Sequence, residues 1–499
     1  MDDHSPSRPP KHLRATLFLA CLAQFMVILD VSVVNVALPA IRSGLHFSEQ
    51  DLQWVVNAYT VTFAGFLLLG GRAADLLGRR RVFVAGLLLF AAASLAGGLA
   101  SSQLTLIAAR AVQGLGGAVI APASLSILTS TFEEGPARNR AVGIWGAMGG
   151  IGGAAGVLLG GVLTDLLSWR WILFINVPIG VLAALAAQRL VAEGRSVQRG
   201  QSFDFTGAVT ATLGLTVLVL GIVRTDATGW GSVETLGLIV AGLVLLAVFI
   251  GVEGRLARHP LMPLRIYRSR TLSAANLIVL LLGGATFGMW FFLSLYLQQV
   301  LGYSPLKAGF SFLPMTLCIV AGSVFASRAV SKVGVKTLLV VGMLVETVGL
   351  LLFTRIGADG TYLNDVLAAS LLSAIGIGLS FVPATISAVA GVDQSEAGLA
   401  SGLVNTSRLF GGALGLAILA AIAAARTNTD LHHAQSAHVA LSSGFDLAFV
   451  IAGGFAAVAA AISLFALPRV RPAEEAEPEV RRPAPEPEPE KPHRVPAGV

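Results

Sequence analysis

The sequence predicts an all-α integral membrane protein, and this prediction depends on the overall composition and on a regular series of long apolar segments. Of the 499 residues, 55% are hydrophobic and only 12% are charged, and the mean hydropathy is +0.77. A soluble protein of this size needs more charged residues to cover its surface. We therefore expect lipid, rather than water, to surround most of the chain.

Fourteen segments are long and apolar enough to cross a bilayer, which takes about 20 residues of α-helix. They lie at about residues 15–39, 53–71, 82–100, 104–128, 141–163, 170–190, 204–223, 234–252, 271–297, 308–327, 335–355, 363–389, 399–424 and 446–467. The first is too long for the core of a signal peptide, so we expect it to be retained as a helix.

The basic residues predict the orientation of these helices. Most of them lie in the loops after every second segment, for example in the run Arg79 to Arg81 and at Arg138, Arg140 and Arg265. Because Lys and Arg accumulate in cytoplasmic loops, both termini are expected to lie on the cytoplasmic side of the cell membrane. The net charge of +6 is spread over these loops, so we expect no nucleic-acid partner.

The order of the segments predicts two six-helix bundles with an inserted helix pair. The loop at residues 71–80 is repeated in weaker form at residues 327–336, with shared Arg, Gly and basic positions. Repeated halves around a central site are typical of alternating-access transporters. We expect a cytoplasmic segment 1–14, a first bundle 15–200, an inserted pair 201–255, a second bundle 256–467 and a disordered tail 468–499, which is rich in Pro and Glu.

Five segments, in order along the chain, resemble the major facilitator superfamily and its fourteen-helix drug:proton antiporter branch. They are Leu29–Pro39, Gly71–Arg81, Arg110–Gly117, Trp169–Gly180, and Tyr296–Pro305 taken with Ser401–Arg408. The resemblance implies a monomeric, proton-coupled antiporter that exports drug-like or antibiotic molecules by alternating access. Its expected partners are a lipophilic small molecule, protons and membrane lipid, with no cofactor.

One departure from that branch leaves an alternative open. The run Gly152–Gly161 in the fifth helix contains no proline, whereas the antiporter signature places prolines after its glycines. An importer or uniporter of the same fold, acting on a small metabolite, therefore remains a second interpretation. An enzyme is not expected, because no His, Ser or Cys cluster has a suitable spacing, and the absence of a Gly-Lys-Ser or Gly-Lys-Thr phosphate loop argues against ATP-driven transport.

Two ionisable residues in the first half are the main candidates for proton coupling. Asp30 lies inside the first predicted helix and Arg110 inside the fourth, at depths that differ by roughly 5 Å on the basis of helical rise. An unpaired charge at such a depth costs about 2.5–3.5 kcal/mol. The functional interpretation is that Asp30 binds a proton or a cationic substrate while Arg110 tunes the pKa of Asp30. The alternatives are a purely structural buried pair and an Asp30 that is hydrogen-bonded to backbone.

The second half contributes two further candidates for proton coupling or substrate binding. Glu346 is an acid inside the eleventh predicted helix and Arg408 is a base inside the thirteenth. Glu346 can be a proton carrier or a neutral structural acid, and Arg408 can face the cavity or pair with a neighbouring helix. Neither alternative is decided by the sequence.

The loop after the second helix predicts a conformational latch. Its residues are Gly71, Arg72, Asp75, Gly78, Arg79 and Arg80. An acid at this helix end can pair with loop arginines and with a neighbouring helix N-terminus. The alternative is a solvated basic turn that only sets topology.

Small residues predict a packing seam along the fifth helix. Gly146, Gly149, Gly153, Gly156 and Gly160 recur every three or four residues, which places them on one face and allows close helix packing. His432, His433 and His438 lie in the last predicted outer loop. No Cys or carboxylate completes a ligand set with them, so no metal is expected.

Overall fold

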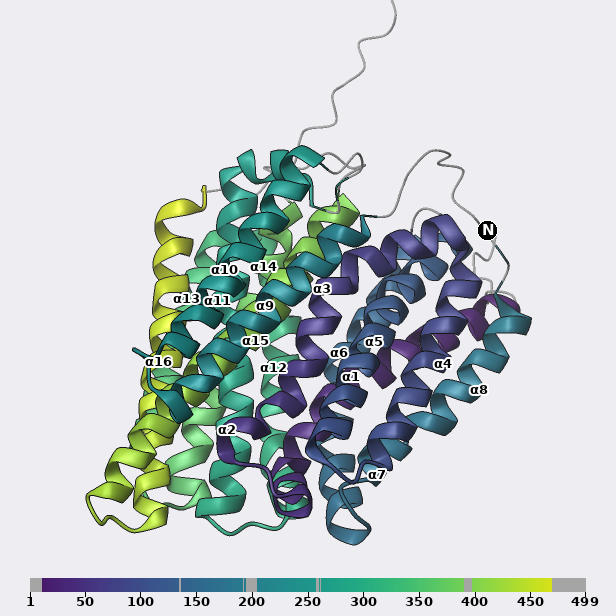
Figure 1. The fold of residues 1–499 in the computed structure, drawn as a ribbon. Coiled ribbons are helices and arrows are strands. Elements are labelled where there is room, and N and C mark those ends of the chain that lie inside the picture. The colour runs from purple at the N-terminus through teal and green to yellow at the C-terminus, as the bar shows by residue number, and fades with distance from the viewer. Residues whose placement is uncertain are drawn as a thin grey trace, which may run out of the picture.

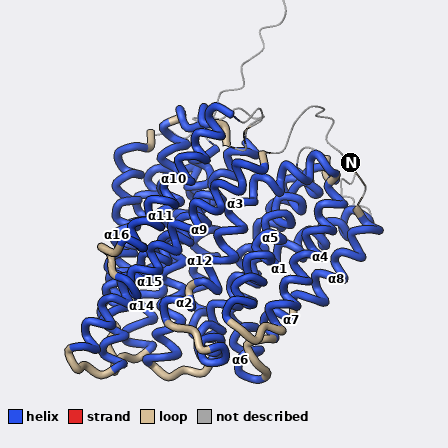
Figure 2. The backbone as a smooth tube through the Cα atoms, in the orientation of Figure 1, coloured by secondary structure: helices blue, strands red, loops and turns tan. Residues whose placement is uncertain are grey.

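The computed structural model describes residues 11–133, 136–191, 193, 204–256, 260, 262–389 and 397–468. These residues form helices and no strand (Figure 2), and 14 helical stretches are long and apolar enough to cross a membrane. Residues 1–10 of the predicted segment 1–14 and residues 469–499 of the predicted tail 468–499 lie outside the described residues.

The first six spanning stretches form one bundle. Its helices are α1 (Lys11–Leu45), α3 (Trp54–Leu77), α4 (Arg79–Gly98), α5 (Gln103–Thr131), α6 (Pro136–Leu166), and the consecutive α7 (Trp171–Phe174) and α8 (Asn176–Leu190). The short α2 (Glu49–Leu52) precedes α3. Contacts are densest between α3 and α5, α1 and α6, and α4 and α5.

The last six spanning stretches form a second bundle beside the first (Figure 1). Its helices are α11 (Arg270–Leu295) with the π-helical turn η3 (Tyr296–Val300), α12 (Pro305–Val333), α13 (Val335–Leu352), α14 (Leu367–Val389) after η5 (Tyr362–Val366), α15 (Ala397–His432) and α16 (Ala437–Ala466). The most extensive helix contacts repeat those of the first bundle. Helix α13 packs on α14 as α4 packs on α5, and α11 packs on α15 as α1 packs on α6.

Two glycines mark the same turn in each half. Gly78 between α3 and α4 has φ 103°, and Gly334 between α12 and α13 has φ 87°. Non-glycine residues rarely adopt such angles, so each turn requires glycine. The weak sequence repeat at 71–80 and 327–336 therefore reflects the same backbone turn in each half.

The inserted pair packs across the boundary between the bundles. It consists of α9 (Phe205–Thr228) and α10 (Val233–Gly251), followed by η1 (Val252–Leu256) and the short helix η2 (Leu264–Arg268). The α9 residues Leu215 and Val219 share an apolar cluster with Val61 of α3 and Ala417 of α15. The outer helix α10 contacts mainly α9 and leaves Val240 and Leu243 exposed, as expected for a lipid-facing helix.

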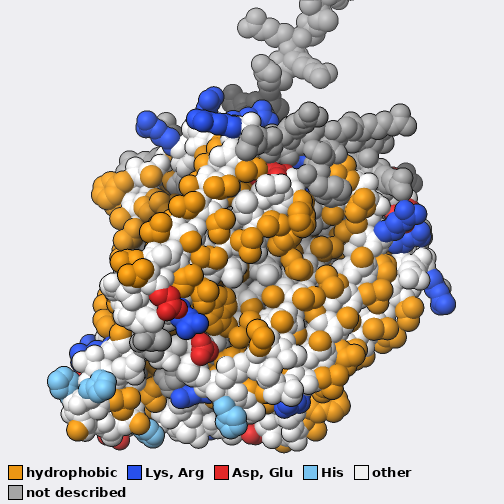
Figure 3. All heavy atoms as spheres, viewed as in Figure 1, with side chains coloured by type: hydrophobic (Ala, Val, Ile, Leu, Met, Phe, Trp, Pro, Cys, Tyr) orange, Lys and Arg blue, Asp and Glu red, His pale blue; other side chains and the backbone are white. Residues whose placement is uncertain are grey.

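We call the face at which α1 begins the amino face and the opposite one the distal face. Figure 3 shows hydrophobic side chains over most of the visible flank, with Lys and Arg gathered mainly along its upper edge, the amino face. Leu185, Val244 and Phe310, for example, are each more than 50% exposed. Such a band matches an apolar surrounding and not water.

The two bundles meet closely toward the distal face. Ser294 Oγ of α11 donates a 2.6 Å hydrogen bond to the Asn35 carbonyl oxygen of α1, and Gln298 Nε2 donates to the Val36 carbonyl at 2.9 Å. Gly309 of α12 also lies against the α6 backbone at Val157. Toward the amino face, Gly143 and Gly146 of α6 face open space. The first and second bundles are therefore closed against each other along α1, α6, α11 and α12 on the distal side.

Several helices extend beyond their predicted apolar runs. The last two were predicted at 399–424 and 446–467, but α15 continues to His432 and α16 already begins at Ala437. Polar contacts stabilise these helix ends. Arg426 pairs with Asp430 at 3.2 Å near the end of α15, and Ser436 caps the start of α16. The prediction that all three histidines lie in the outer loop is therefore wrong, since His432 belongs to α15 and His438 to α16. Hydropathy measures the apolar run, whereas a helix continues wherever polar side chains still satisfy its ends.

Candidate functional site

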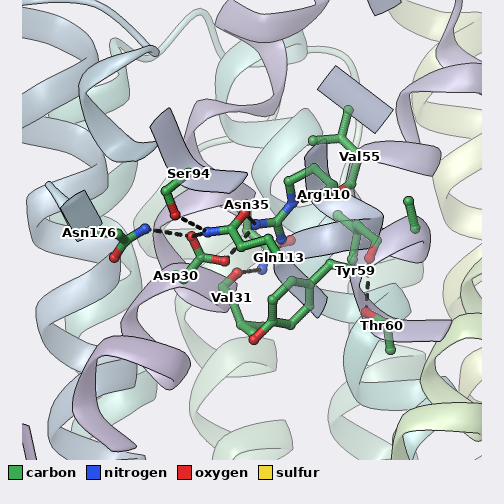
Figure 4. Close-up of polar contacts among 12 residues, drawn as sticks. Asp30, Val31, Asn35, Val55, Tyr59, Thr60, Ser94, Arg110, Gln113 and Asn176 are labelled. Atoms are coloured by element: carbon green, nitrogen blue, oxygen red, sulfur yellow. Dashed lines mark hydrogen bonds and ion pairs between the residues drawn. The ribbon is translucent and has the colours of Figure 1, made fainter. Parts of the chain in front are cut away.

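Asp30 lies at the centre of a buried polar network in the first bundle (Figure 4). Its side chain is 0% exposed. Oδ2 accepts a 2.5 Å hydrogen bond from Arg110 Nη1 of α5. Oδ1 accepts from Gln113 Nε2 at 2.7 Å and from Asn176 Nδ2 at 2.8 Å. The carboxylate therefore joins α1 to α5 and α8 in the interior of the bundle.

The Arg110 guanidinium is equally enclosed. Besides Asp30, it donates from Nε to the Val55 carbonyl oxygen at 3.0 Å and from Nη1 to Gln113 Oε1 at 2.7 Å. Its Cζ atom lies 4.5 Å from the ring centroid of Tyr59, a cation–π contact that favours a desolvated cation. Buried ion pairs are tolerated when further hydrogen bonds satisfy both partners, and this pair meets that condition.

Glycines in α5 bring the neighbouring helices close enough to build the network. A Cβ atom on Gly114 would lie 2.3 Å from the Tyr59 carbonyl oxygen, and one on Gly116 would lie 2.9 Å from the Phe90 backbone nitrogen. Only glycine therefore allows α3 and α4 to approach α5 this closely. The same run of the sequence, Arg110–Gly117, thus supplies both the charge and the close packing that encloses it.

The sequence predicts that Asp30 and Arg110 lie close together, but it assigns no role to three other members of the network. Gln113, Asn176 and Ser94 are all 1% exposed or less, and Gln113 Nε2 also donates to Ser94 Oγ at 2.8 Å. Gln113 follows Arg110 by three residues, which puts both on one helix face. Polar residues on that face of an apolar helix were the signal available.

Glu346 lies apart from this network, in the contact between α13 and α14. It is 0% exposed, and neither carboxyl oxygen has a hydrogen-bond partner. Gly376 of α14 packs directly on it: a Cβ atom there would lie 2.4 Å from the Glu346 backbone nitrogen. Ser373 and Ser370, also on α14, have hydroxyl groups without partners. Glu346 is thus a buried acid in a seam of small residues.

Arg408 is partly exposed on α15. Its Nη2 approaches Asn405 Oδ1 at 3.5 Å, a long contact, and its Cζ lies 5.7 Å from the ring centroid of Phe381 on α14. Nε has no hydrogen-bond partner. The guanidinium therefore retains donor capacity and sits beside an aromatic ring that is 43% exposed.

The predicted latch residues lie at the amino-face ends of α3 and α4. Arg79 Nη2, at the start of α4, lies 4.0 Å from Asp75 Oδ1, near the end of α3. Arg80 pairs with Glu193 at 3.0 Å, and Arg81 lies 3.7 Å from the same carboxylate. A Cβ on Gly71 would only touch Pro122 of α5, at 3.4 Å. The two pairs with Glu193 tie the start of α4 to the segment just after α8.

The predicted glycine seam of α6 is shorter than expected. Cβ atoms on Gly156 and Gly160 would lie 2.9 Å and 2.8 Å from carbonyl oxygens of α1, and one on Gly153 would lie 3.8 Å from Ser32 Oγ. Gly146 and Gly149, by contrast, face open space. The seam therefore occupies the distal part of α6, where α6 packs on α1.

The described residues contain no group of three or more His, Cys, Asp or Glu side chains placed to hold a metal ion.

The family of the chain follows from comparison with known sequences. The model of the Major Facilitator Superfamily matches residues 20–416 and 315–496. The chain belongs to the major facilitator superfamily.

Relatives within the superfamily are named for antibiotic export and resistance. The cephamycin export protein of Amycolatopsis lactamdurans is 44% identical over 414 residues, which is 83% of this chain and 85% of that protein. The puromycin resistance protein of Streptomyces alboniger is 39% identical, with 88% of each chain covered. The match thus includes both bundles and the inserted pair.

Solved structures of other members share the fold at low sequence identity. A bacterial homolog of the human lysosomal transporter Spinster, in an inward-facing and unoccupied conformation, has a TM-score of 0.63 and 17% identity, covering 92% of this chain and 98% of that one. A peptide transporter crystallised with sulfate has a TM-score of 0.65 and 17% identity, with 91% and 94% covered. The major facilitator architecture is therefore present over nearly the whole chain.

Proposed function

We propose that this protein is a proton-coupled antiporter that exports drug-like or antibiotic molecules by alternating access, with Asp30 as its proton-binding group. The observation that carries the proposal is the complete burial of the Asp30 carboxylate among three side-chain donors. The relatives named for export of cephamycin and resistance to puromycin support export as the direction.

The geometry supports a coupling between the proton and helix packing. In this conformation, Asp30 acts only as an acceptor, from Arg110, Gln113 and Asn176. Protonation removes the negative charge that Arg110 balances and adds an O–H group that has to donate, so the contacts around the carboxyl group have to change. Because the donors belong to α5 and α8 while Asp30 belongs to α1, proton binding shifts the balance between two packings of these helices.

Sidedness and conformational state are part of the proposal. The positive-inside bias makes the amino face cytoplasmic. The contacts of Ser294 and Gln298 with α1 then close the extracellular side, and this state is inward-facing. The latch ion pairs at Asp75, Arg79 and Arg80 belong to the cytoplasmic side and are expected to exchange when that side closes.

Arg408 and Glu346 receive supporting roles. Arg408 has an unpartnered Nε beside the Phe381 ring, which suits a contact with the polar part of an aromatic substrate. A proton moving inward across 100 mV releases about 2.3 kcal/mol, which supports roughly 40-fold accumulation of a neutral substrate. Export of a monovalent cation cancels this electrical term, so such a substrate requires a pH gradient or a second proton. Glu346 is the candidate for that second proton.

Transport by reconstituted protein tests the proposal. Inside-out vesicles with an imposed proton gradient are given lipophilic cations, antibiotics and neutral drugs, and substrate accumulation and proton release are measured. Wild type is expected to accumulate substrate and to release protons with it. Asp30→Asn is expected to lose proton-coupled accumulation, whereas Asp165→Asn, an exposed acid at the distal end of α6, is expected to retain it.

Two outcomes would contradict the proposal. Proton-coupled accumulation by Asp30→Asn at the wild-type rate, with normal folding, would remove Asp30 from the mechanism. Substrate movement in the same direction as the protons, or equally fast with all ion gradients collapsed, would favour the importer or uniporter instead.

A further inference from the structure

A second pair of buried acids lies where the inserted pair joins the rest of the molecule. Asp204 caps the start of α9, and its Oδ1 accepts from the Gly207 backbone N–H at 2.8 Å. Glu253 follows α10, and its Oε2 accepts from the Met262 backbone N–H at 2.8 Å. The side chains are 8% and 3% exposed. One oxygen of each carboxyl group is therefore satisfied by backbone.

The other two oxygens converge on one point and lack donors. A Cβ atom on Gly207 would lie 2.6 Å from Glu253 Oε1 and 2.8 Å from Asp204 Oδ2. Neither atom has a hydrogen-bond partner, although the two carboxyl groups are within hydrogen-bonding reach of each other. Two carboxylates supply only acceptors. A single proton shared between them provides the missing donor for both.

Arg72 determines the charge balance at this pair. Its guanidinium, at the amino-face end of α3, interacts electrostatically with both Asp204 and Glu253. Among the described residues, the groups that act on Glu253 are Asp204, Arg72 and the Met262 amide. With one proton bound, the acid pair carries one negative charge that Arg72 balances. Without it, a second negative charge is buried, and like charges at such short range repel strongly.

We propose that Asp204 and Glu253 form a proton-binding pair that holds the start of α9, the end of α10 and the following segment together beside Arg72 of the first bundle. Met262 leads directly into η2, where Ile266 packs with Leu68 of α3 and Leu403 of α15. The pair thus holds a segment that touches both bundles on the amino face. Loss of the shared proton separates the carboxyl groups and releases the Met262 amide, so this connection loosens as the pH on the amino face rises.

Amide hydrogen exchange on the full-length protein tests this directly and requires no transport. Exchange at Met262 and in η2 is measured from pH 6 to pH 9 and corrected for intrinsic amide chemistry. The corrected wild-type rate is expected to rise by up to about tenfold per pH unit over the range in which the closed pair holds its proton and the opened segment does not, and to level off once the closed pair has lost that proton. Glu253→Gln is expected to abolish this rise. The Gln amide group donates to Asp204 with no titratable proton, and the pair keeps the single negative charge of the protonated wild-type pair.

Controls separate the pair from general pH effects. Glu234→Gln neutralises an exposed acid that lies 3.7 Å from Arg224, and it is expected to retain the wild-type pH dependence. Asp204→Asn is the reciprocal variant, since its amide oxygen still caps Gly207 and its amide nitrogen donates to Glu253. A corrected wild-type rate that is independent of pH would overturn the proposal, as would unchanged pH dependence in a folded Glu253→Gln or Asp204→Asn variant. Either result would leave the role proposed for Asp30 unaffected.

Discussion

Asp30 and Glu346 are both fully buried acids inside membrane-spanning helices, yet their surroundings are opposite. Asp30 accepts hydrogen bonds from three side chains and pairs with Arg110. Glu346 has no partner for either oxygen and packs on Gly376. One acid is thus part of a satisfied network, and the other lies in a seam of glycine and serine.

The difference shows that burial alone does not define the energetic role of an intramembrane acid. A satisfied network loses stability when any member is removed, because the remaining polar groups stay buried without partners. An acid without partners lowers stability by its presence. The two sites are therefore expected to respond to apolar substitution with opposite signs.

The largest expected effect is at the satisfied site. Arg110→Met leaves the Asp30 carboxylate buried without its counter-charge, and we expect a loss of about 3–5 kcal/mol of stability. The melting temperature of the purified protein in detergent measures this loss. The double variant Asp30→Leu with Arg110→Met removes both charges and is expected to recover a substantial part of it. A double variant no more stable than Arg110→Met would mean that the ion pair is not the origin of the effect.

A smaller effect of opposite sign is expected at Glu346. Glu346→Met keeps a similar volume and removes a polar group without partners, which is expected to stabilise the protein by about 1–3 kcal/mol. The same melting experiment, with Arg110→Met as the reference, detects the difference in sign. If Glu346→Met melts well below wild type, the carboxyl group has a stabilising partner, and the contrast between the two acids fails.

The sequence predicted the fold more completely than the site, for physical reasons. Apolar length and the positions of basic loops identify spanning helices without reference to tertiary contacts, and all 14 were found. Asp30 and Arg110 were identifiable because charges are rare at that depth. Ser94 and Asn176 are neutral side chains, which are common in such helices, and only the fold brings Asn176 to Asp30 and Ser94 to Gln113. The pair Asp204 and Glu253 was missed because acids near helix ends look solvated until α9, η1 and Met262 are packed together.

The smallest expected effect distinguishes the seam around Glu346 from an open helix face. Gly376→Ala places a methyl group 2.4 Å from the Glu346 backbone nitrogen, so α13 and α14 have to separate, with an expected loss of about 1–3 kcal/mol. Gly149→Ala is the matched control, since it is also a glycine inside a helix but faces open space. Helix propensity favours both substitutions by up to about 1 kcal/mol, so the difference between their melting temperatures isolates the packing term. Equal melting temperatures would show that the α13–α14 seam can adjust to a methyl group, and that the absence of partners for Glu346 is not enforced by close helix contact.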